Sequence, residues 1–478
     1  MIGFWTARRL ALPLFVVAAV LAAFNGLSAG LVDADWWWHL ETGRLILDQR
    51  MIPPADPFSW THRGEPWVLQ SWLFQAGLAW LWQMWGEPAV AVSAAVLLAL
   101  GYWIAFITAD RLLQRPALTA AMAVIVGAGI IVAGAPRPQL ISLVLFALYL
   151  AVFCQAKYGG KLRPLVCLPV LMILWVNVHG AFVLGAATVV GVAVLEWAEF
   201  ARGRRDKAQR RFCLWLTAAA VATLAATGLN PWGYAHWAYP FYVTGLDLTR
   251  AIVEWQSIMR SPLLGPWYAV GGAAFFLALA SAPRRPHLVE MLAPAALFVA
   301  GLMQARHAPF ASIAMLVFVA PSLWRDRAEV LPWPGGTRVA GWLVAVLSFL
   351  TPLLLVRDPY PEAIRMIMPS DITAHIAQTA PQGRMFNDYA IGGYLIHRLG
   401  RDHPVFIDGR ADLYGDAFFK AYLATVTGAV PLNRHFDGWE IGYAILRPEQ
   451  ALTQMLLMRG WRIAFHGRSH LVLLPPPS

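Results

Sequence analysis

The sequence predicts an α-helical polytopic membrane protein with about 11 transmembrane helices and a small C-terminal α/β domain outside the cytoplasm. Of the 478 residues, 59% are hydrophobic and 13% are charged, and the mean hydropathy is +0.55. Soluble globular proteins carry about 25% charged residues. Apolar windows long enough to cross about 30 Å of hydrocarbon recur up to residue 356, after which the composition becomes mixed.

Eleven apolar segments are the expected spans of a transmembrane domain that covers residues 1–356. The first segment follows Arg8 and Arg9 as in a signal peptide, but it is long enough to span and lacks a small-residue cleavage site, so we expect an uncleaved helix. A short NVHG sequence separates the fifth segment from the sixth, which predicts that the fifth is short or tilted. The segments are 10–32, 88–109, 117–134, 139–156, 164–177, 180–200, 213–229, 265–282, 287–304, 308–324 and 338–356.

Lys and Arg predict the orientation, because connections on the cytoplasmic side carry an excess of them. Alternate connections are rich in these residues, above all the GRRDKAQRR loop at 203–211, whereas the other connections are longer and carry fewer. We therefore expect a multi-pass protein of the inner (plasma) membrane with a cytoplasmic N-terminus. An odd number of spans then places the C-terminal domain, 357–478, in the periplasm or outside the cell.

The net charge of +10 does not indicate nucleic-acid binding, because the basic residues lie in short clusters between apolar segments. Cys154, Cys167 and Cys213 lie in or beside apolar segments, at spacings that suit neither a zinc site nor a disulfide framework. We expect these cysteines to pack as apolar side chains.

The first outer loop, 33–87, is long and is expected to be structured. Residues 36–48 have helical spacing, and the sequence PPADP at 53–57 predicts a turn. The segment 67–85 is apolar and rich in tryptophan, which is typical of a helix lying in the membrane interface. The tryptophans of DADWWWHLETG at 33–43 have the composition of an aromatic belt at the same surface.

The C-terminal segment alternates predicted strands and helices, which indicates a small α/β domain. The expected strands lie in RMFNDYAIGGYLIHRL, PVFIDGRADLYG, YAILRPE and WRIAFHGRSHLVLLPP, with helices near 371–380, 416–428 and 448–459. Polar residues cluster at the predicted strand ends, where turn formation is the favoured interpretation and a docking surface or a lid is the alternative. They are Asn387, Asp388, Asp408, Arg410 and Asp412.

Asp33 and Asp35 are candidate catalytic residues, because a carboxylate near hydrocarbon is costly unless it faces a cavity, a partner or water. On an ideal helix they point in different directions, but in a non-helical segment both could hold one divalent cation such as Mg²⁺ or Mn²⁺. The alternative is that they mark the end of the first helix.

Most of the other outer turns carry a cation, an amide or an imidazole, whereas the inner turns carry mainly Lys and Arg. One polar cavity that opens outward explains this difference. Arg137, Arg306 and His307 are candidates to bind a phosphate, since guanidinium groups fork onto phosphate oxygens, although pairing with lipid headgroups is an alternative for each arginine. The candidate cavity-lining residues are His39, Gln139, Asn177, His179 and Asn230.

A cavity that combines carboxylates with phosphate-binding cations predicts group transfer from a lipid-phosphate donor. A carboxylate would act as general base or hold a cation, and arginines would stabilise the phosphate as it leaves. Water-soluble nucleotide sugars are not expected outside the cytoplasm, so a sugar donor would be linked to polyprenyl phosphate.

In these features the chain resembles the GT-C superfamily of polytopic glycosyltransferases, which includes oligosaccharyltransferase catalytic subunits, protein mannosyltransferases and lipid A aminoarabinose transferases. The resemblance rests on DADWWWHLETGRLI and IPPADPFSWTHRGEPWVLQSWL, with RPQ, NVHG, RH, FNDYAIGGYLIHRL and VFIDGRADLYG. It implies an acidic motif after the first helix, so that Asp33 or Asp35 falls where the family keeps its catalytic or acceptor-positioning acid. The chain lacks a WWD-type signature, so peptide-acceptor binding is not carried over to it.

The sequence therefore predicts a membrane glycosyltransferase that uses a polyprenyl-phosphate-linked sugar and inverts the configuration at the transferred carbon. The acceptor class, whether lipid, glycan or protein, stays open. Two alternatives are a lipid or glycan transporter (flippase) and a non-catalytic scaffold of surface-polysaccharide assembly. A transporter is disfavoured because the polar residues gather at one face rather than at the midplane, and because no paired halves with broken helices are visible.

Overall fold

The computed structural model describes residues 35–203, 206–247, 249, 252–323 and 368–477. The chain divides into two compact units. The described part of the first unit lies within Pro88–Pro240 and Ile252–Arg357, and that of the second within Leu31–Glu87, Phe241–Ala251 and Asp358–Ser478. The predicted spans 10–32 and 338–356 lie outside the described residues.

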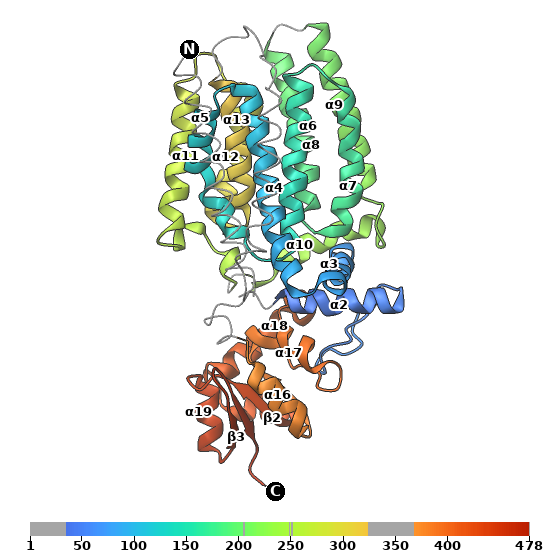
Figure 1. Cartoon of the computed structure of the whole chain (residues 1–478), viewed down its shortest axis with the longest axis vertical. Helices are drawn as coiled ribbons and strands as arrows, with labels where there is room; N and C mark the ends of the chain where they lie inside the picture. The colour runs from blue at the N-terminus through green and yellow to red at the C-terminus, as the bar shows by residue number, and fades with distance from the viewer. Residues whose placement is uncertain (1–34, 204–205, 248, 250–251, 324–367, 478) are drawn as a thin grey trace. The chain divides into compact units, whose positions relative to one another are not determined.

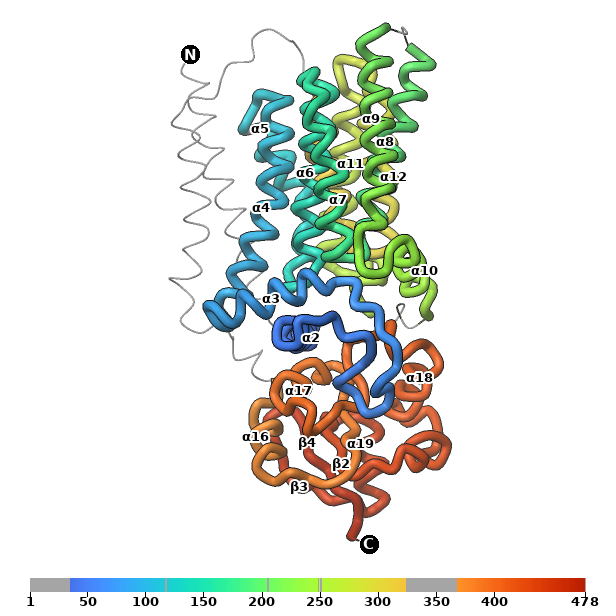
Figure 2. The backbone as a smooth tube through the Cα atoms, turned by 90° about the vertical axis from the view of Figure 1, so that its right-hand side faces the viewer, coloured from blue at the N-terminus to red at the C-terminus, as the bar shows by residue number. Residues whose placement is uncertain are grey.

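The first unit is a bundle of helices that run side by side (Figures 1 and 2). The nine spans predicted between residues 88 and 324 are each present as a helix. Three of these helices, α4, α6 and α8, are long and apolar enough to cross a membrane. The bundle contains α4 (Glu87–Leu113), α5 (Pro116–Val126) continued by the 3₁₀ helix η1 (Gly127–Ala133), α6 (Gln139–Lys157), η2 (Arg163–Val166) continued by α7 (Cys167–Val178), α8 (Phe182–Arg202), α9 (Lys207–Ala226), α11 (Leu264–Ala280), α12 (Leu288–Met303) and α13 (Ala308–Ser322); α10 (Ala238–Gly245) lies in the connection after α9.

Helix α13 is buried along its whole length, from Ala308 to Ser322. A helix that is apolar on all sides belongs in the interior of a bundle. Its neighbour η1 approaches closely because it carries glycine: a Cβ on Gly129 would lie only 2.3 Å from the carbonyl oxygen of Ala308. The small residue therefore allows the two backbones to pack together.

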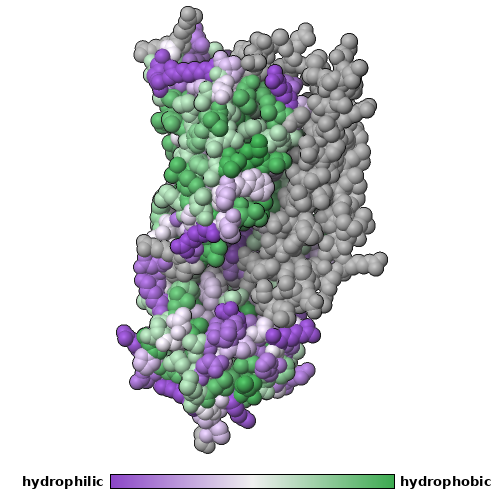
Figure 3. Space-filling view, turned by 90° about the vertical axis from the view of Figure 1, so that its left-hand side faces the viewer, coloured by the Kyte–Doolittle hydropathy of each residue, from purple (hydrophilic) through white to green (hydrophobic). Residues whose placement is uncertain are grey.

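On the face seen in Figure 3, the coloured surface of the bundle is largely apolar. Large apolar side chains that would be costly to expose to water are exposed on the bundle helices, which is the expected arrangement for helices that contact lipid. Examples are Val170, Val194, Val221, Leu277 and Val299, with exposed fractions of 52–67%.

At the end of the bundle that holds the basic connections, a buried carboxylate has hydrogen-bonding partners. Glu290 has no exposed surface, and its carboxylate accepts hydrogen bonds from Tyr158 Oη at 2.6 Å, Arg284 Nη2 at 2.7 Å and Ser322 Oγ at 3.0 Å. A buried carboxylate is stable only when partners of this kind replace its water. This cluster ties together helices α6, α12 and α13.

In the second unit, the first outer loop forms α2 (Asp35–Gln49) and α3 (Trp72–Trp85), which pack against each other. The helix expected at 36–48 is confirmed, whereas the segment expected at 67–85 becomes helical only at Trp72. The prediction that the tryptophans after Asp35 form an aromatic belt is wrong for two of them. Trp36 and Trp37 are 0% and 3% exposed, because they stack on each other and pack against other rings of the same unit.

The C-terminal segment is an α/β structure, as predicted. Its four-stranded sheet has the order β1-β2-β4-β3, in which β1 and β2 are parallel and the other pairs antiparallel. The expected strand at PVFIDG is wrong, because Val405 makes only an isolated bridge to Ser59 of the first loop. The elements are α16 (Ser370–Thr379), β1 (Arg384–Asn387), α17 (Gly392–Leu399), α18 (Ala411–Val426), β2 (Ile441–Leu446), α19 (Ala451–Met458), β3 (Arg462–His466) and β4 (Leu471–Leu474).

Candidate functional site

Of the two acids singled out in the first outer loop, Asp33 lies outside the described residues and Asp35 is the first residue of α2. An acid in the first turn is favoured by the positive end of the helix dipole. The Asp35 carboxylate lies against the backbone of Gly409, since a Cβ on that glycine would come within 1.8 Å of Asp35 Oδ1. The candidate acid of the first loop therefore contacts the C-terminal segment.

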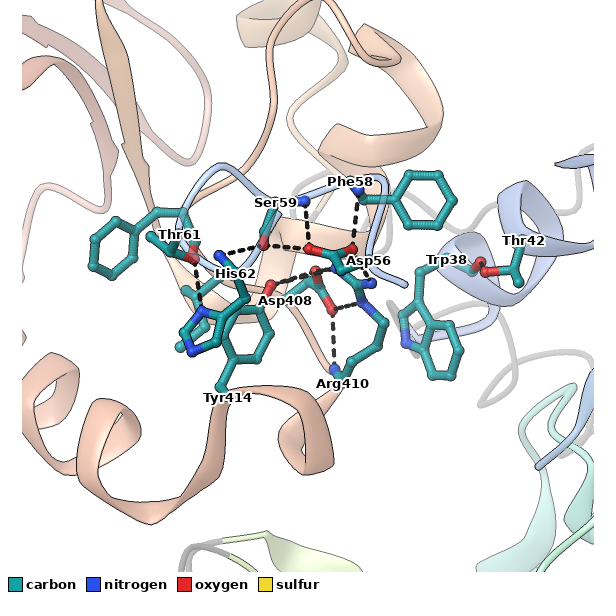
Figure 4. Close-up of polar contacts among 12 residues, drawn as sticks. Trp38, Thr42, Asp56, Phe58, Ser59, Thr61, His62, Asp408, Arg410 and Tyr414 are labelled. Atoms are coloured by element: carbon teal, nitrogen blue, oxygen red, sulfur yellow. Dashed lines mark hydrogen bonds and ion pairs between the residues drawn. The ribbon is translucent and has the colours of Figure 1, made fainter. Parts of the chain in front are cut away.

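A buried ion cluster next to this contact joins the first loop to the C-terminal segment (Figure 4). The Arg410 guanidinium donates to both oxygens of Asp408, from Nε at 2.8 Å and from Nη2 at 2.6 Å, and from Nη1 to Asp56 Oδ1 at 2.5 Å. The exposed fractions of Arg410, Asp408 and Asp56 are 0%, 0% and 2%. Tyr414 adds a hydrogen bond from its hydroxyl to Asp408 Oδ2 at 2.7 Å. Burial alone would lower the pKa of Arg410, but the two carboxylates and the tyrosine raise it well above its usual value.

Local backbone geometry prepares Asp56 for this cluster. The sequence predicts a turn at PPADP, and in that turn Asp56 Oδ1 accepts from the backbone N–H of Phe58 and Oδ2 from that of Ser59, each at 3.0 Å. Aspartate commonly bonds to the backbone two or three residues further on. The side chain is therefore held in place before it meets Arg410, whose guanidinium also lies over the Trp67 ring, 4.7 Å from its centroid.

Further contacts fasten the first loop to the same segment. Trp60 Nε1 donates to the backbone carbonyl of Met385 at 2.8 Å, and Thr61 Oγ1 donates to that of Phe406 at 2.8 Å. On α2, Glu41 Oε1 lies 2.7 Å from His397 Nδ1 of α17. The loop is thus part of the folded C-terminal unit.

In the bundle unit, the structure brings together the predicted phosphate-binding residues Arg137 and Arg306 and the predicted cavity-lining residue Gln139. Arg137 Nη1 pairs with Glu254 Oε2 at 2.9 Å, and Gln139 Nε2 donates to the backbone carbonyl of Arg306 at 3.1 Å. The Arg306 guanidinium lies over the Trp255 ring, 4.0 Å from its centroid, and makes no hydrogen bond to any described residue. It is therefore a cation whose donors are available to an oxyanion.

Two other predicted cavity residues, His179 and Asn177, have structural partners within the bundle unit. His179 Nδ1 lies 2.8 Å from Ser142 Oγ, which also accepts from Trp175 Nε1. Asn177 Nδ2 donates to the carbonyls of Ile173 and Leu229, at 2.8 Å each.

Asn230 closes its own turn, donating to the carbonyls of Thr227 and Gly233. His307 lies beside Arg306, and burial followed by the charge of Arg306 lowers its pKa to about 4. It is therefore neutral at pH 7 and would contact a phosphate as a hydrogen-bond donor rather than as a cation.

His39 belongs to the second unit, where its imidazole lies 3.1 Å from the Gln75 amide and packs on Trp38 and Phe74. The described residues contain no group of three or more His, Cys, Asp or Glu side chains that could hold a metal ion. Asp33 lies outside the described residues, so a cation held by Asp33 and Asp35 stays a prediction.

Sequence reasoning recognised Asp408 and Arg410 as polar strand-end residues but favoured turn formation for them, and it passed over Asp56. The turn interpretation is correct for Asp388 and Asp408, whose carboxylates accept from the backbone N–H two residues further on, each at 3.0 Å. The Asn387 side chain instead bonds to the backbone of 406–407. Two sequence features belong to the ion cluster: the Asp-Gly-Arg sequence at 408–410, and an acid, Asp56, in the distant proline-rich turn. Only the fold shows that the two meet.

No protein-family model matches the chain, and no curated protein matches its sequence. Solved structures show that the chain has a GT-C-like fold. It is similar to ArnT from Cupriavidus metallidurans in the apo state, with a TM-score of 0.53 and 17% identity over 97% of this chain and 98% of that one.

The chain is also similar to the archaeal oligosaccharyltransferase AglB from Archaeoglobus fulgidus in complex with an inhibitory peptide and a dolichol-phosphate. That match has a TM-score of 0.55 and 11% identity and covers 93% of this chain and 70% of the other. A structure of the Archaeoglobus fulgidus enzyme with Zn and sulfate matches with a TM-score of 0.51 and 11% identity, over 91% of this chain and 68% of that one. This protein is therefore an α-helical polytopic membrane protein of GT-C-like fold.

Replacing Arg410 by Met is expected to destabilise the second unit by about 3–5 kcal/mol, because it leaves Asp56 and Asp408 as buried carboxylates without a cation. Thermal unfolding of the detergent-purified protein, followed by tryptophan fluorescence, measures this loss. The matched control is Arg459→Met, which breaks an ion pair to Asp437 of similar length but nearly half exposed, worth about 0–1 kcal/mol. Equal effects of the two substitutions would contradict a structural role for the buried cluster.

Because of His62, we expect the folded protein to lose stability as the pH falls. Burial lowers its pKa below the usual 6.5, so the unfolded chain takes up the proton first. The stabilising contribution is therefore present above about pH 6.5 and is lost as the pH falls below it. The melting temperature should drop more between pH 7.5 and pH 5.5 for the wild type than for His62→Phe. Equal drops in the two proteins would contradict this role of His62.

Proposed function

We propose that this protein is a membrane glycosyltransferase that moves a sugar from a polyprenyl-phosphate-linked donor to a lipid, glycan or protein acceptor on the outer face of the membrane. The observation that carries the proposal is the Arg306 guanidinium, which packs on Trp255 and has no hydrogen-bonded partner among the described residues. The GT-C-like fold supports the same class of reaction.

The charge around Arg306 favours an anionic ligand. Glu254 already pairs with Arg137, and among the described residues it is the carboxylate whose charge acts on Arg306, while the charge of Arg137 opposes it. A phosphate monoanion or diester would add negative charge beside Arg306, and guanidinium binds phosphate oxygens with two parallel hydrogen bonds. The indole of Trp255 holds the guanidinium plane in a fixed orientation, which reduces the entropy lost on binding.

The proposed reaction is an inverting displacement at the sugar's anomeric carbon. An acceptor hydroxyl attacks that carbon, its proton passes to the carboxylate of Asp33 or Asp35, and the bond from carbon to the donor phosphate oxygen breaks. Polyprenyl phosphate leaves with the bonding electron pair. Within the bundle unit, Arg306 and Arg137 are the proposed ligands of its phosphate, with His307 as a hydrogen-bond donor, whereas the acid is proposed from its place in the sequence. The other candidates are kept as predicted cavity-lining residues: His39, Gln139, Asn177, His179 and Asn230.

Donor binding tests the role of Arg306. Native mass spectrometry of the detergent-purified protein with a panel of undecaprenyl-phosphate sugars should show a selective complex, and Arg306→Ala should weaken it by about 10- to 100-fold, because hydrogen bonds to a charged group contribute about 1.5–3 kcal/mol. Arg285→Ala, in the connection between α11 and α12 at the opposite end of the bundle, is the control and should bind as the wild type does. The proposal fails if the wild type binds no phosphopolyprenyl lipid.

Turnover tests the acids separately from binding. With a radiolabelled undecaprenyl-phosphate sugar, and native membranes as the source of acceptor, Asp33→Asn and Asp35→Asn identify the base: loss of the base should lower transfer by about 10²- to 10⁴-fold while donor binding is kept. Asp48→Asn, at the exposed end of α2, is the control. Full transfer by both variants would rule out an acid of this motif as the base.

A further inference from the structure

Gly409 is placed directly against the candidate acid. A Cβ on this residue would lie 1.8 Å from Asp35 Oδ1, 2.7 Å from Asp35 Cγ and 3.3 Å from Trp38 Nε1. Gly409 is not among the glycines with positive φ, so its backbone conformation is open to any residue. The position requires glycine for space rather than for conformation, and what occupies that space is the Asp35 carboxylate.

The residues on either side of Gly409 are those of the buried ion cluster. Asp408 Oδ1 accepts from the backbone N–H of Arg410 at 3.0 Å as well as from its guanidinium, which closes a tight turn around the glycine. The Arg410 guanidinium then fixes this turn to Asp56 of the first loop. The backbone at Gly409 therefore has little freedom to move away from Asp35.

Helix α2 is also held by contacts with helix α17. Trp37 stacks on His397 with ring centroids 4.3 Å apart and meets the Tyr394 ring edge-on at 5.5 Å, both on α17. Together with the contact between Glu41 and His397, these rings fix the axis of α2 relative to the turn at 408–410. Both partners in the contact between Asp35 and Gly409 are thus held by rigid surroundings.

We propose that Gly409 is a positioning residue that sets the location of the Asp35 carboxylate for proton transfer, and that the Asp56–Arg410–Asp408 cluster is the frame that holds it there. The inference rests on the proposed function, because it assigns a catalytic use to Asp35. It adds that the C-terminal segment contributes to catalysis by shaping the environment of an acid that belongs to the first loop. General-base catalysis depends on such placement, since an error of about 1 Å can cost about 100-fold in rate.

Gly409→Ala tests this directly. The methyl group would displace the carboxylate end of the Asp35 side chain, because the backbone on both sides of the contact is held in place, and the acid would leave its working position. We expect kcat for release of undecaprenyl phosphate to fall by about 10- to 100-fold, with the KM for the undecaprenyl-phosphate sugar unchanged and the melting temperature close to that of the wild type. Gly438→Ala is the matched control, because its added Cβ meets nothing within 4 Å, and it should behave as the wild type does.

A thermal double-mutant cycle checks the contact independently of activity. If the methyl group of Gly409→Ala meets the Asp35 carboxylate, its small effect on the melting temperature should disappear in an Asp35→Ala background. Additive effects would overturn the contact. Wild-type kcat in Gly409→Ala, or in Asp35→Asn measured alongside it, would overturn the positioning role while leaving donor binding at Arg306 intact. A wild type that releases no undecaprenyl phosphate would instead overturn the proposed function, and this inference with it.

Discussion

The ion cluster around Arg410 is the interaction on which the second unit depends. It joins residues 354 positions apart, and its three charged side chains are buried from solvent, so neither carboxylate can be left without its cation. Two carboxylates facing one guanidinium leave a net negative charge, which the Tyr414 hydroxyl and the backbone N–H groups around Asp56 help to disperse. A cluster that is this strongly directional specifies one arrangement of the first loop on the C-terminal segment.

The bundle uses polar groups in two different ways. Glu290, Asn177 and Asn230 have their hydrogen bonds satisfied by neighbouring side chains or carbonyls, which is what an apolar environment demands of a polar group that only supports the fold. Arg306 differs, because an aromatic face holds its guanidinium while its donors stay unused among the described residues. This contrast, rather than the presence of polar residues alone, separates a candidate ligand-binding group from a structural one.

The predicted loop helix at 36–48 and the predicted turn at 53–57 show how far local patterns reach. Both form where the sequence indicates, because helical spacing and Asp-Pro turn chemistry act over a few residues. The aromatic belt was the wrong interpretation of Trp36 and Trp37, since composition does not show whether a tryptophan meets lipid or another ring of the protein. The strand expected at PVFIDG was likewise wrong, because its β-branched and aromatic residues are used to contact the first loop.

The sequence by itself determined the class of fold: long apolar segments, a mixed C-terminal segment and polar outer turns follow from hydrophobic burial and membrane thickness, which act along the chain. It also singled out Arg137, Arg306 and Asp35. Only the tertiary structure decided that Arg137 has a carboxylate partner, that the Arg306 guanidinium is held by Trp255, and that Asp35 meets Gly409. Those outcomes depend on side chains from distant parts of the chain converging in three dimensions, and no local pattern encodes such distances.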